Sequence, residues 1–441
     1  MKLTELQGIL RDNGIVGAGG AGFPTYAKLS EKADTVILNC AECEPLLKLH
    51  RQVLEKHPQE IFEALDLISK TVNAKKVYIA LKKSYVKTAQ AIEPYTQFFK
   101  NIEIFRLNDV YPAGDEVVLT YEVTGRVVPP GNIPLSVGVT VVNVETVYNV
   151  YNAVNGTPVT HKYVTVAGEV ENPVTVCVPI GITVGEVLKM AGNITTQDPS
   201  FIIGGPMMGV LGSPANIVTK TTNAVLVLPS VHPLIKKRQA KTFIDMKRAM
   251  AACCQCSYCT SLCSRNLLGH PINPSEFMRV ASNGITNDAA PYINSLYCSG
   301  CGLCEEYSCG QGLSPRTLLA ACKAQLRNAG IKPTQMQESP TPQPERPLRQ
   351  VPMSRLTSRI GLKAYNKPAP MIEEQPQFKK VTLLLSQHIG APSEATVKKG
   401  DTVVENQLIA NAADGLSVAL HSPISGKVTA VGKTAIIIEK Q

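Results

Sequence analysis

Eight of the thirteen cysteines fall into two short runs whose spacing suits iron-sulfur ligation. The first run has the spacing C-x2-C-x2-C-x3-C, and the second ends with x4 in place of x3. This tight spacing lets three thiolates converge on one 4Fe-4S cluster, whereas zinc sites usually separate two C-x2-C pairs by about a dozen residues or more. We therefore predict two 4Fe-4S clusters and one-electron chemistry. The eight predicted ligands are Cys253, Cys256, Cys259, Cys263, Cys298, Cys301, Cys304 and Cys309.

The fourth cysteine of each run is expected to cross to the other cluster, as it does in two-cluster ferredoxins. Cluster one would then be bound by Cys253, Cys256, Cys259 and Cys309. Cluster two would be bound by Cys298, Cys301, Cys304 and Cys263. Crossing over brings the two clusters close enough for rapid electron transfer between them.

The other five cysteines need no role as cluster ligands. Cys177, Cys254 and Cys322 are expected to be ordinary free thiols, which are common in protein interiors. Cys40 and Cys43 form a lone C-x2-C pair. We expect this pair to pack beside a cofactor, with a redox pair or half of a metal site as the alternative.

A glycine-rich loop, GAGGAG, occupies residues 17–22. It satisfies the G-x-G-x-x-G pattern, but a short helical stretch precedes it where the dinucleotide fingerprint requires a strand. Glycines allow the backbone to approach a phosphate closely, and a following helix N-terminus adds affinity for anions. The loop therefore favours a phosphate-bearing cofactor, and a plain tight turn is the alternative.

Alternating elements follow the glycine loop as far as residue 153. Three short apolar runs, at residues 35–39, 76–81 and 102–107, are predicted strands. Between them, residues 58–73 and 85–99 carry apolar side chains at helical spacing. This alternation predicts an α/β layer with a mostly parallel sheet.

After residue 155 the composition of the sequence changes several times along the chain. We therefore predict a multidomain protein with α/β and α+β domains. The linker holds nine of the 31 prolines and no apolar periodicity. Its basic stretch at 354–367 is interpreted as a solvated tether, with a docking helix as the alternative. The predicted segments are an α/β domain at 1–155, a small β-domain with one helix at 160–235, a cysteine-bearing helical segment at 241–330, the linker at 331–378, and a compact β-sandwich or barrel at 379–441.

Composition excludes several classes of protein. The net charge of +9 is scattered over 441 residues with 5% aromatics, so we expect no nucleic-acid partner. No run approaches the roughly 20 apolar residues of a membrane span, and the first residues lack the apolar region of a secretory signal. A cytoplasmic protein is the expectation.

Four separated segments resemble a known superfamily. GAGGAGFPTYAK (17–28) with NCAECEP (39–45) resembles the FMN-binding and NADH-binding signatures of the complex I flavoprotein subunit and of the RnfC subunit. YPAGDE (111–116) and VVNVETVYNV (141–150) are similar to two further flavin-contacting segments of that superfamily. The order of the domains is most similar to the PduS-type cobalamin reductases of propanediol-utilisation microcompartments. In RnfC, the barrel-sandwich element instead lies ahead of the flavin domain.

The resemblance implies a fold and a set of site residues. The domains would be a Rossmann-like FMN domain, a β-grasp (SLBB) domain, a two-cluster ferredoxin-like helical segment and an unmodified barrel-sandwich hybrid of the biotinyl or lipoyl type. The FMN phosphate and ring edge would be held by Gly17, Gly19, Gly20, Gly22 and Lys28. The isoalloxazine and ribityl chain would contact Asn39, Glu42, Gly114, Asp115, Glu116 and Asn143. The nicotinamide nucleotide would meet Phe23 and Glu44, with Glu44 the expected catalytic residue.

The resemblance also implies a function. NADH gives up two electrons together and a cluster accepts one, so a flavin between them would resolve the mismatch. The acceptor would be cobalamin, reduced from cob(III)alamin through cob(II)alamin to cob(I)alamin, with a corrin adenosyltransferase and microcompartment shell proteins as partners. The protein would lie inside a bacterial microcompartment. Two alternatives stay open: an RnfC-like enzyme that reduces a flavodoxin, a ferredoxin or a radical-enzyme activase, and a non-catalytic adaptor that senses redox state.

Overall fold

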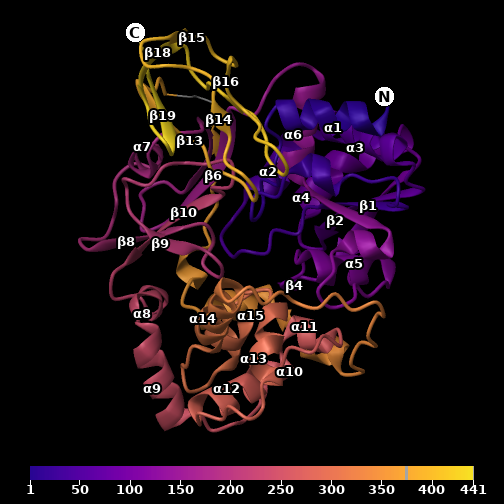
Figure 1. Cartoon of the computed structure of the whole chain (residues 1–441), viewed down its shortest axis with the longest axis vertical. Helices are drawn as coiled ribbons and strands as arrows, with labels where there is room; N and C mark the ends of the chain where they lie inside the picture. The colour runs from indigo at the N-terminus through magenta and orange to yellow at the C-terminus, as the bar shows by residue number, and fades with distance from the viewer. Residues whose placement is uncertain (373–375, 441) are drawn as a thin grey trace.

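A four-stranded parallel sheet organises the N-terminal domain (Figure 1). The structure is a computed structural model that describes residues 1–372 and 376–440. The strands lie in the order β3-β2-β1-β5, and every neighbouring pair is parallel. The three strands predicted from apolar runs are confirmed. The strands are β1 (Thr35–Asn39), β2 (Lys76–Lys82), β3 (Ile102–Leu107) and β5 (Val139–Asn143).

Helices cover the sheet, and proline and asparagine set their ends. The predicted helix at 58–73 is confirmed: it begins with Pro58 in its first turn and ends at Asn73, which adopts a left-handed conformation with φ 58°. The predicted helix at 85–99 is shorter, because Pro94 lacks the N–H that a helix interior requires; the α-helix stops at Ile92 and a 3-10 turn follows. The helices are α1 (Leu3–Asp12), α2 (Leu49–Lys56), α3 (Pro58–Val72), α4 (Val86–Ile92), α5 (Glu116–Thr124) and α6 (Val144–Val154).

A β-grasp domain follows the N-terminal domain. Its first two strands form an antiparallel hairpin, its helix α7 (Val184–Lys189) begins with a capping box at Thr183, and its last strand β10 pairs in parallel with β6. A buried ion pair between Lys162 of β6 and Glu145 of α6 joins it to the N-terminal domain. The strands are β6 (His161–Gly168), β7 (Val174–Pro179), β8 (Pro199–Ile203), β9 (Val210–Gly212) and β10 (Ala224–Pro229).

Short helices carry the cysteine runs at the end of the molecule opposite the C-terminal domain (Figure 1). Their core contains Ala249, Phe277 and Leu319, and several of the predicted ligand cysteines pack against it. The helices are α8 (Pro233–Gln239), α9 (Thr242–Ala252), α10 (Tyr258–Ser261), α11 (Ser264–Leu267), α12 (Pro274–Ser282), α13 (Ala290–Ile293) and α14 (Pro315–Asn328). Two of the longer helices, α12 and α14, begin with proline in the first turn.

Within the proline-rich linker, the basic stretch at 354–367 packs against the rest of the chain, so its interpretation as a solvated tether is wrong and the alternative of a docking helix holds. Strand β11 (Val351–Pro352) pairs with the short strand β4 (Val110–Tyr111) of the N-terminal domain. Helix α15 (Met353–Arg359) buries Leu356 completely, and β12 (Met371–Ile372) adds an edge strand beside β7. The buried apolar side chains of the linker are spaced irregularly along the sequence. Its packing could therefore not be predicted from a helical or strand period.

Two small antiparallel sheets form the C-terminal domain, as a barrel-sandwich requires. It lies against the start of the chain: Arg11 donates to the carbonyl of Ala413 at 2.8 Å and accepts the Ala419 N–H at 3.0 Å through its own carbonyl. Within the described residues, no helix combines the length and the apolar composition that crossing a membrane demands. The strands are β13 (Lys380–Leu384), β14 (Glu394–Ala395), β15 (Thr402–Val403), β16 (Leu408–Asn411), β17 (Leu420–His421), β18 (Gly426–Val431) and β19 (Ala435–Glu439).

Candidate flavin and cluster sites

The candidate flavin site lies where the parallel sheet reverses its strand order. Strand β1 has β2 on one side and β5 on the other, and its last residue, Asn39, is the register partner of Asn143 at the end of β5. Ligands of open α/β sheets bind at the carboxyl ends of the strands at such a switch point. Two of the predicted FMN contacts therefore meet at the position that the topology favours.

Side chains predicted to contact FMN pair with one another around this point. The Asn39 amide donates to the carbonyl of Gly114 at 2.9 Å, and Lys28 pairs with Glu116 at 2.5 Å. A Cβ on Gly19 would lie 2.5 Å from the Asn143 side-chain nitrogen, so the glycine loop passes directly over β5. The structure thus brings segments 17–28, 39–45, 111–116 and 141–150 together.

The glycine loop itself has one open side and one covered side. Gly19 and Gly20 are exposed, so a phosphate can approach their backbone. The amide of Gly17 donates to the carbonyl of Phe23 at 2.9 Å, which closes the loop. Gly22 has φ 72° and lies under Thr221 and His388, because a Cβ there would meet both within about 3 Å. The open side fits a phosphate-bearing cofactor such as FMN.

Sequence reasoning missed a group of cations that surrounds Glu42. The carboxylate of Glu42 accepts the His50 N–H at 2.9 Å, and Arg51 lies 3.5 Å from its second oxygen. Lys82 is 2% exposed and donates to the Glu42 carbonyl at 2.6 Å. Burial raises the pKa of Glu42 and lowers the pKa of Lys82. A charged residue directly after the apolar run of a parallel strand, as Lys82 is after residues 77–81 of β2, was the available signal.

Two predicted contacts are already engaged by other parts of the chain. Asp115 caps α5 by accepting the N–H groups of Val117 and Val118, and it pairs with Arg265 at 2.9 Å. Glu44 accepts the backbone N–H groups of Met207 and Met208 at 2.7 and 2.8 Å. Both carboxylates therefore hold neighbouring domains against the flavin domain, and their contacts with flavin or nicotinamide stay predictions.

Glu44 gives the docking of the β-grasp domain a pH dependence. Burial raises the pKa of Glu44 from 4.5 to about 7, because the desolvation outweighs the two N–H donors. The folded protein favours the protonated carboxyl. The contribution of Glu44 to the free energy of unfolding is therefore fully present below pH 4.5 and is lost as the pH rises through about 7.

Glu44→Gln mimics the protonated carboxyl. We expect its melting temperature to match wild type at low pH and to exceed it by roughly 3 °C above neutral pH. Paired thermal melts across this range measure the difference, and a wild-type advantage that grew with pH would contradict it.

The eight predicted ligand cysteines form two groups. Cys259 interacts electrostatically with Cys256, Cys309 and Cys253. Cys304 interacts with Cys298, Cys301 and Cys263. Cys309 thus lies with the first three cysteines of the other run, and Cys263 with the second group, which is the crossed grouping.

Backbone amides point at the thiols of both groups. Gly300 donates to the Cys298 sulfur at 3.4 Å and Leu313 to the Cys309 sulfur at 3.3 Å. Hydrogen bonds to sulfur are typical of cluster ligands and tune cluster potentials. Within the described ranges no three His, Cys, Asp or Glu side chains converge on one ion, and a cubane needs no such convergence because each thiolate binds its own iron. The donor set fits two clusters, and each assigned ligand stays a prediction.

The second cysteine group adjoins the flavin site. The Tyr111 hydroxyl donates to the carbonyl of Cys301 at 2.5 Å, and the Tyr111 side chain also interacts electrostatically with Glu44 and Cys43. Cys43 in turn accepts the Gly114 N–H at 2.8 Å, so the lone C-x2-C pair packs beside the flavin segments. A buried tyrosine therefore lies between the flavin site and cluster two.

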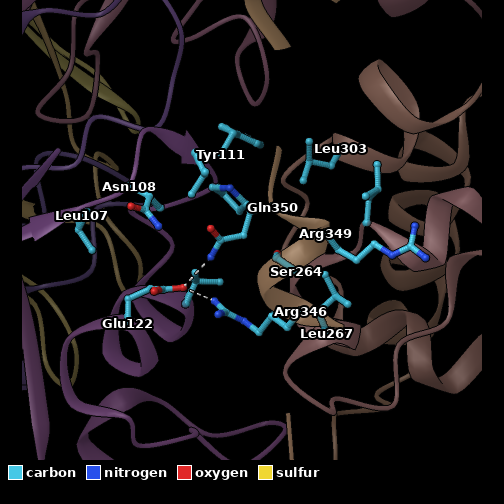
Figure 2. A pocket seen from close by; sticks show the side chains of 15 residues that line it. Leu107, Asn108, Tyr111, Glu122, Ser264, Leu267, Leu303, Arg346, Arg349 and Gln350 are labelled. Atoms are coloured by element: carbon cyan, nitrogen blue, oxygen red, sulfur yellow. Dashed lines mark hydrogen bonds and ion pairs between the residues drawn. The ribbon is translucent and has the colours of Figure 1, made fainter. Parts of the chain in front are cut away.

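An apolar pocket beside Tyr111 shows how the linker closes this joint (Figure 2). Leu107 and Asn108 of the flavin domain line one side, and Ser264 and Leu303 of the cysteine segment line the other. In Figure 2, Arg346 and Gln350 of the linker both reach Glu122, Gln350 at 3.3 Å. The linker thus adds polar contacts at the rim of this joint.

Comparisons with protein families match four consecutive parts of the chain. The chain carries an FMN-binding domain and a 4Fe-4S dicluster domain, as the two cofactor predictions require. The barrel-sandwich match begins at residue 361, inside the predicted linker. The matches are the Nuo51 FMN-binding domain at 10–152, the SLBB domain at 163–211, the 4Fe-4S dicluster domain at 252–314, and the RnfC barrel sandwich hybrid domain at 361–441.

Two curated relatives extend over nearly the whole chain. The sequence is 40% identical to the cobalamin reductase PduS of Salmonella typhimurium strain LT2, over 99% of this chain and 97% of the relative. It is 38% identical to PduS of Citrobacter freundii, over 97% and 95%. An NAD+-reducing NiFe hydrogenase in its H2-reduced state shares the fold, with a TM-score of 0.51 and 20% identity over 76% of this chain and 63% of that one.

Proposed function

Because the chain belongs to the PduS cobalamin reductase family, we propose that it passes electrons from NADH through FMN and two 4Fe-4S clusters to cobalamin, reducing the cobalt as far as cob(I)alamin. The family makes the chain an oxidoreductase built as an iron-sulfur flavoprotein. NADH as donor, both clusters in one path and the final cobalt state are the parts that we propose.

One observation carries the proposal: residues of the flavin site and of cluster two are joined directly. Asp115 precedes α5 at the flavin site and pairs with Arg265, two residues after Cys263. Tyr111 makes the second connection, to Cys301. Such a joint fits transfer between two bound cofactors, since it fixes their separation.

The residues of the chain have simple roles in this proposal. The glycine loop and Lys28 would hold the phosphate end of FMN, and Asn39 and Asn143, which are register partners at the ends of β1 and β5, would contact its ring. The flavin, when bound, supplies the step from two-electron to one-electron transfer. Burial lowers the pKa of His50 to about 3, so this ring stays neutral beside Asn143 and leaves the positive charge of the site to Lys82 and Arg51.

Anaerobic reconstitution followed by a donor and acceptor assay tests the proposal. We expect about one FMN and eight iron atoms per chain, oxidation of NADH, and loss of the cob(II)alamin absorption when NADH is added. Omitting FMN is the control and should stop the reaction. Protein that contained zinc or no inorganic sulfide would overturn the proposal, and so would NADH that failed to reduce the flavin.

A second candidate has its own support. The chain is 31% identical to a component of the Na+-translocating ferredoxin:NAD+ oxidoreductase complex of Acetobacterium woodii, over 63% of this chain and 61% of the relative. Turnover of NADH with flavodoxin but not with any corrinoid would favour this RnfC-like role. Partners such as an adenosyltransferase or microcompartment shell proteins stay predictions, as does location inside a microcompartment.

A further inference from the structure

We infer that electrons leave the protein from cluster one, through a basic and partly apolar surface that fits an acidic electron-carrying protein. This exit surface comprises Lys241, Phe243, Lys247, Met250, Cys256 and Tyr258. The inference deepens the proposed function, because it assigns an order to the two clusters and a chemistry to the partner. It rests on the proposed presence of both clusters.

Cluster two is the entry point because its ligands lie inside the joint. Cys304 is 8% exposed, and Cys301 interacts electrostatically with Asp115 of the flavin site. The Tyr111 hydroxyl of the flavin domain also donates to the Cys301 carbonyl at 2.5 Å. Electron transfer between cofactors weakens steeply with distance, so the cluster beside the flavin receives electrons first.

Cluster one lies at the protein surface. Cys256 is exposed, and so are its neighbours Gln255 and Ser257. Tyr258 is 41% exposed at the start of α10. An acceptor on this side reaches cluster one directly, whereas cluster two is covered by the flavin domain and the linker.

Helix α9 leads into cluster one and presents an unpartnered face. It buries Asp245 and Ala249 against α12 and α14, and ends at Cys253. Its outer face leaves Phe243 67% exposed and Met250 63% exposed. The Lys247 ammonium lies over the Phe243 ring at 4.5 Å. Exposed aromatic and methionine side chains with a charged rim are typical of protein interfaces.

The charge of this face identifies the partner. From residue 236 to residue 262 the exposed charged side chains are all cationic: Lys236, Lys241, Lys247 and Arg248. The single acid in this stretch, Asp245, is buried and accepts from Ser314 at 3.1 Å. A surface whose charges all have one sign attracts a partner surface of the opposite charge and fixes the orientation of the partner. The occupant is therefore a protein with an acidic face that holds the one-electron acceptor.

Charge reversal tests the exit surface without depending on NADH. The enzyme is reduced with dithionite, desalted, and mixed in a stopped-flow instrument with flavodoxin, an acidic one-electron carrier used as the probe. The test variant is Lys241→Glu with Lys247→Glu. The matched control is Lys398→Glu with Lys399→Glu, two exposed lysines of the C-terminal domain. Iron content and the EPR signals of both clusters verify that each variant is intact.

We expect the test variant to lose roughly tenfold in the second-order rate with flavodoxin at low salt, while the control variant keeps the wild-type rate. The rate with cytochrome c, a basic acceptor, should not fall. Should the test variant lose iron, the salt dependence of wild type decides: its rate with flavodoxin should fall steeply as salt is raised to about 0.5 M. Equal rates for the two variants or a salt-independent rate would each overturn the inference.

Discussion

Cys301→Ala is expected to stop electrons at the flavin. The variant should retain FMN and be reduced at the flavin by NADH, while its rate of cob(II)alamin reduction falls at least about 100-fold. The reason is position: Cys301 is the predicted cluster-two ligand whose carbonyl accepts from Tyr111. Without cluster two, the path loses the cluster that adjoins the flavin site. EPR after NADH should show no reduced cluster, whereas dithionite should still reduce cluster one.

Two further cysteine variants make this result specific. Cys256→Ala should remove cluster one alone and leave a cluster that NADH still reduces. Cys177→Ala should change neither iron content nor reduction, because Cys177 lies on β7 and packs against the domain core. Iron and sulfide analysis of the three purified variants distinguishes the outcomes. If Cys177→Ala lost iron, or if NADH reduced a cluster in Cys301→Ala, the ligand assignment and the order of transfer would be wrong.

Gly114→Ala is expected to release most of the FMN. The new Cβ would lie 2.4 Å from the carbonyl oxygen of Ala41 and 2.9 Å from the Cys43 sulfur, so the 39–45 and 111–116 segments would have to separate. Overpacking of this kind costs about 1–3 kcal/mol, which corresponds to roughly 5-fold to 150-fold weaker binding. Flavin content after gel filtration and titration of the apoprotein with FMN measure the effect.

Gly8→Ala is the matched control. Gly8 lies in α1, and a Cβ there meets no atom within 4 Å. Alanine is the better helix former, so this variant should bind FMN normally and unfold at a slightly higher temperature. Normal FMN affinity in Gly114→Ala would show that the flavin lies away from the 111–116 segment.

The parts of the fold that repeat a period could be predicted from the sequence. Strands β1, β2 and β3 are short apolar runs, and helices α3, α12 and α14 carry apolar side chains at helical spacing with proline in the first turn. Both signals are local, so they need no knowledge of neighbours. The two cysteine runs could also be recognised in the sequence, because the spacing of cluster ligands is a local pattern.

The contacts between domains could not be predicted in this way. Leu356 is fully buried, yet it belongs to a cluster that also contains Tyr111, Leu228 and Leu303 from three other parts of the chain. Likewise, nothing near Glu44 in the sequence announces that Met207 and Met208 donate to it. Long-range partners of this kind depend on the assembled topology, and the same holds for the pairing of Asp115 with Arg265.

The position of the C-terminal barrel bears on the order in which the domains can follow one another along the chain. The barrel touches the flavin domain near its first helix, through Arg11 and through the Gly14 carbonyl, which shares Lys220 with Ala419. A domain in this position lies close to the first helix of the flavin domain, although the chain reaches it only after the cysteine segment and the linker. A barrel-first order, which the resemblance to RnfC describes, would therefore place the barrel beside the same helix α1 that it contacts here. When the barrel comes last, the linker must run from the cysteine segment back to the first helix, and this requirement accounts for its length.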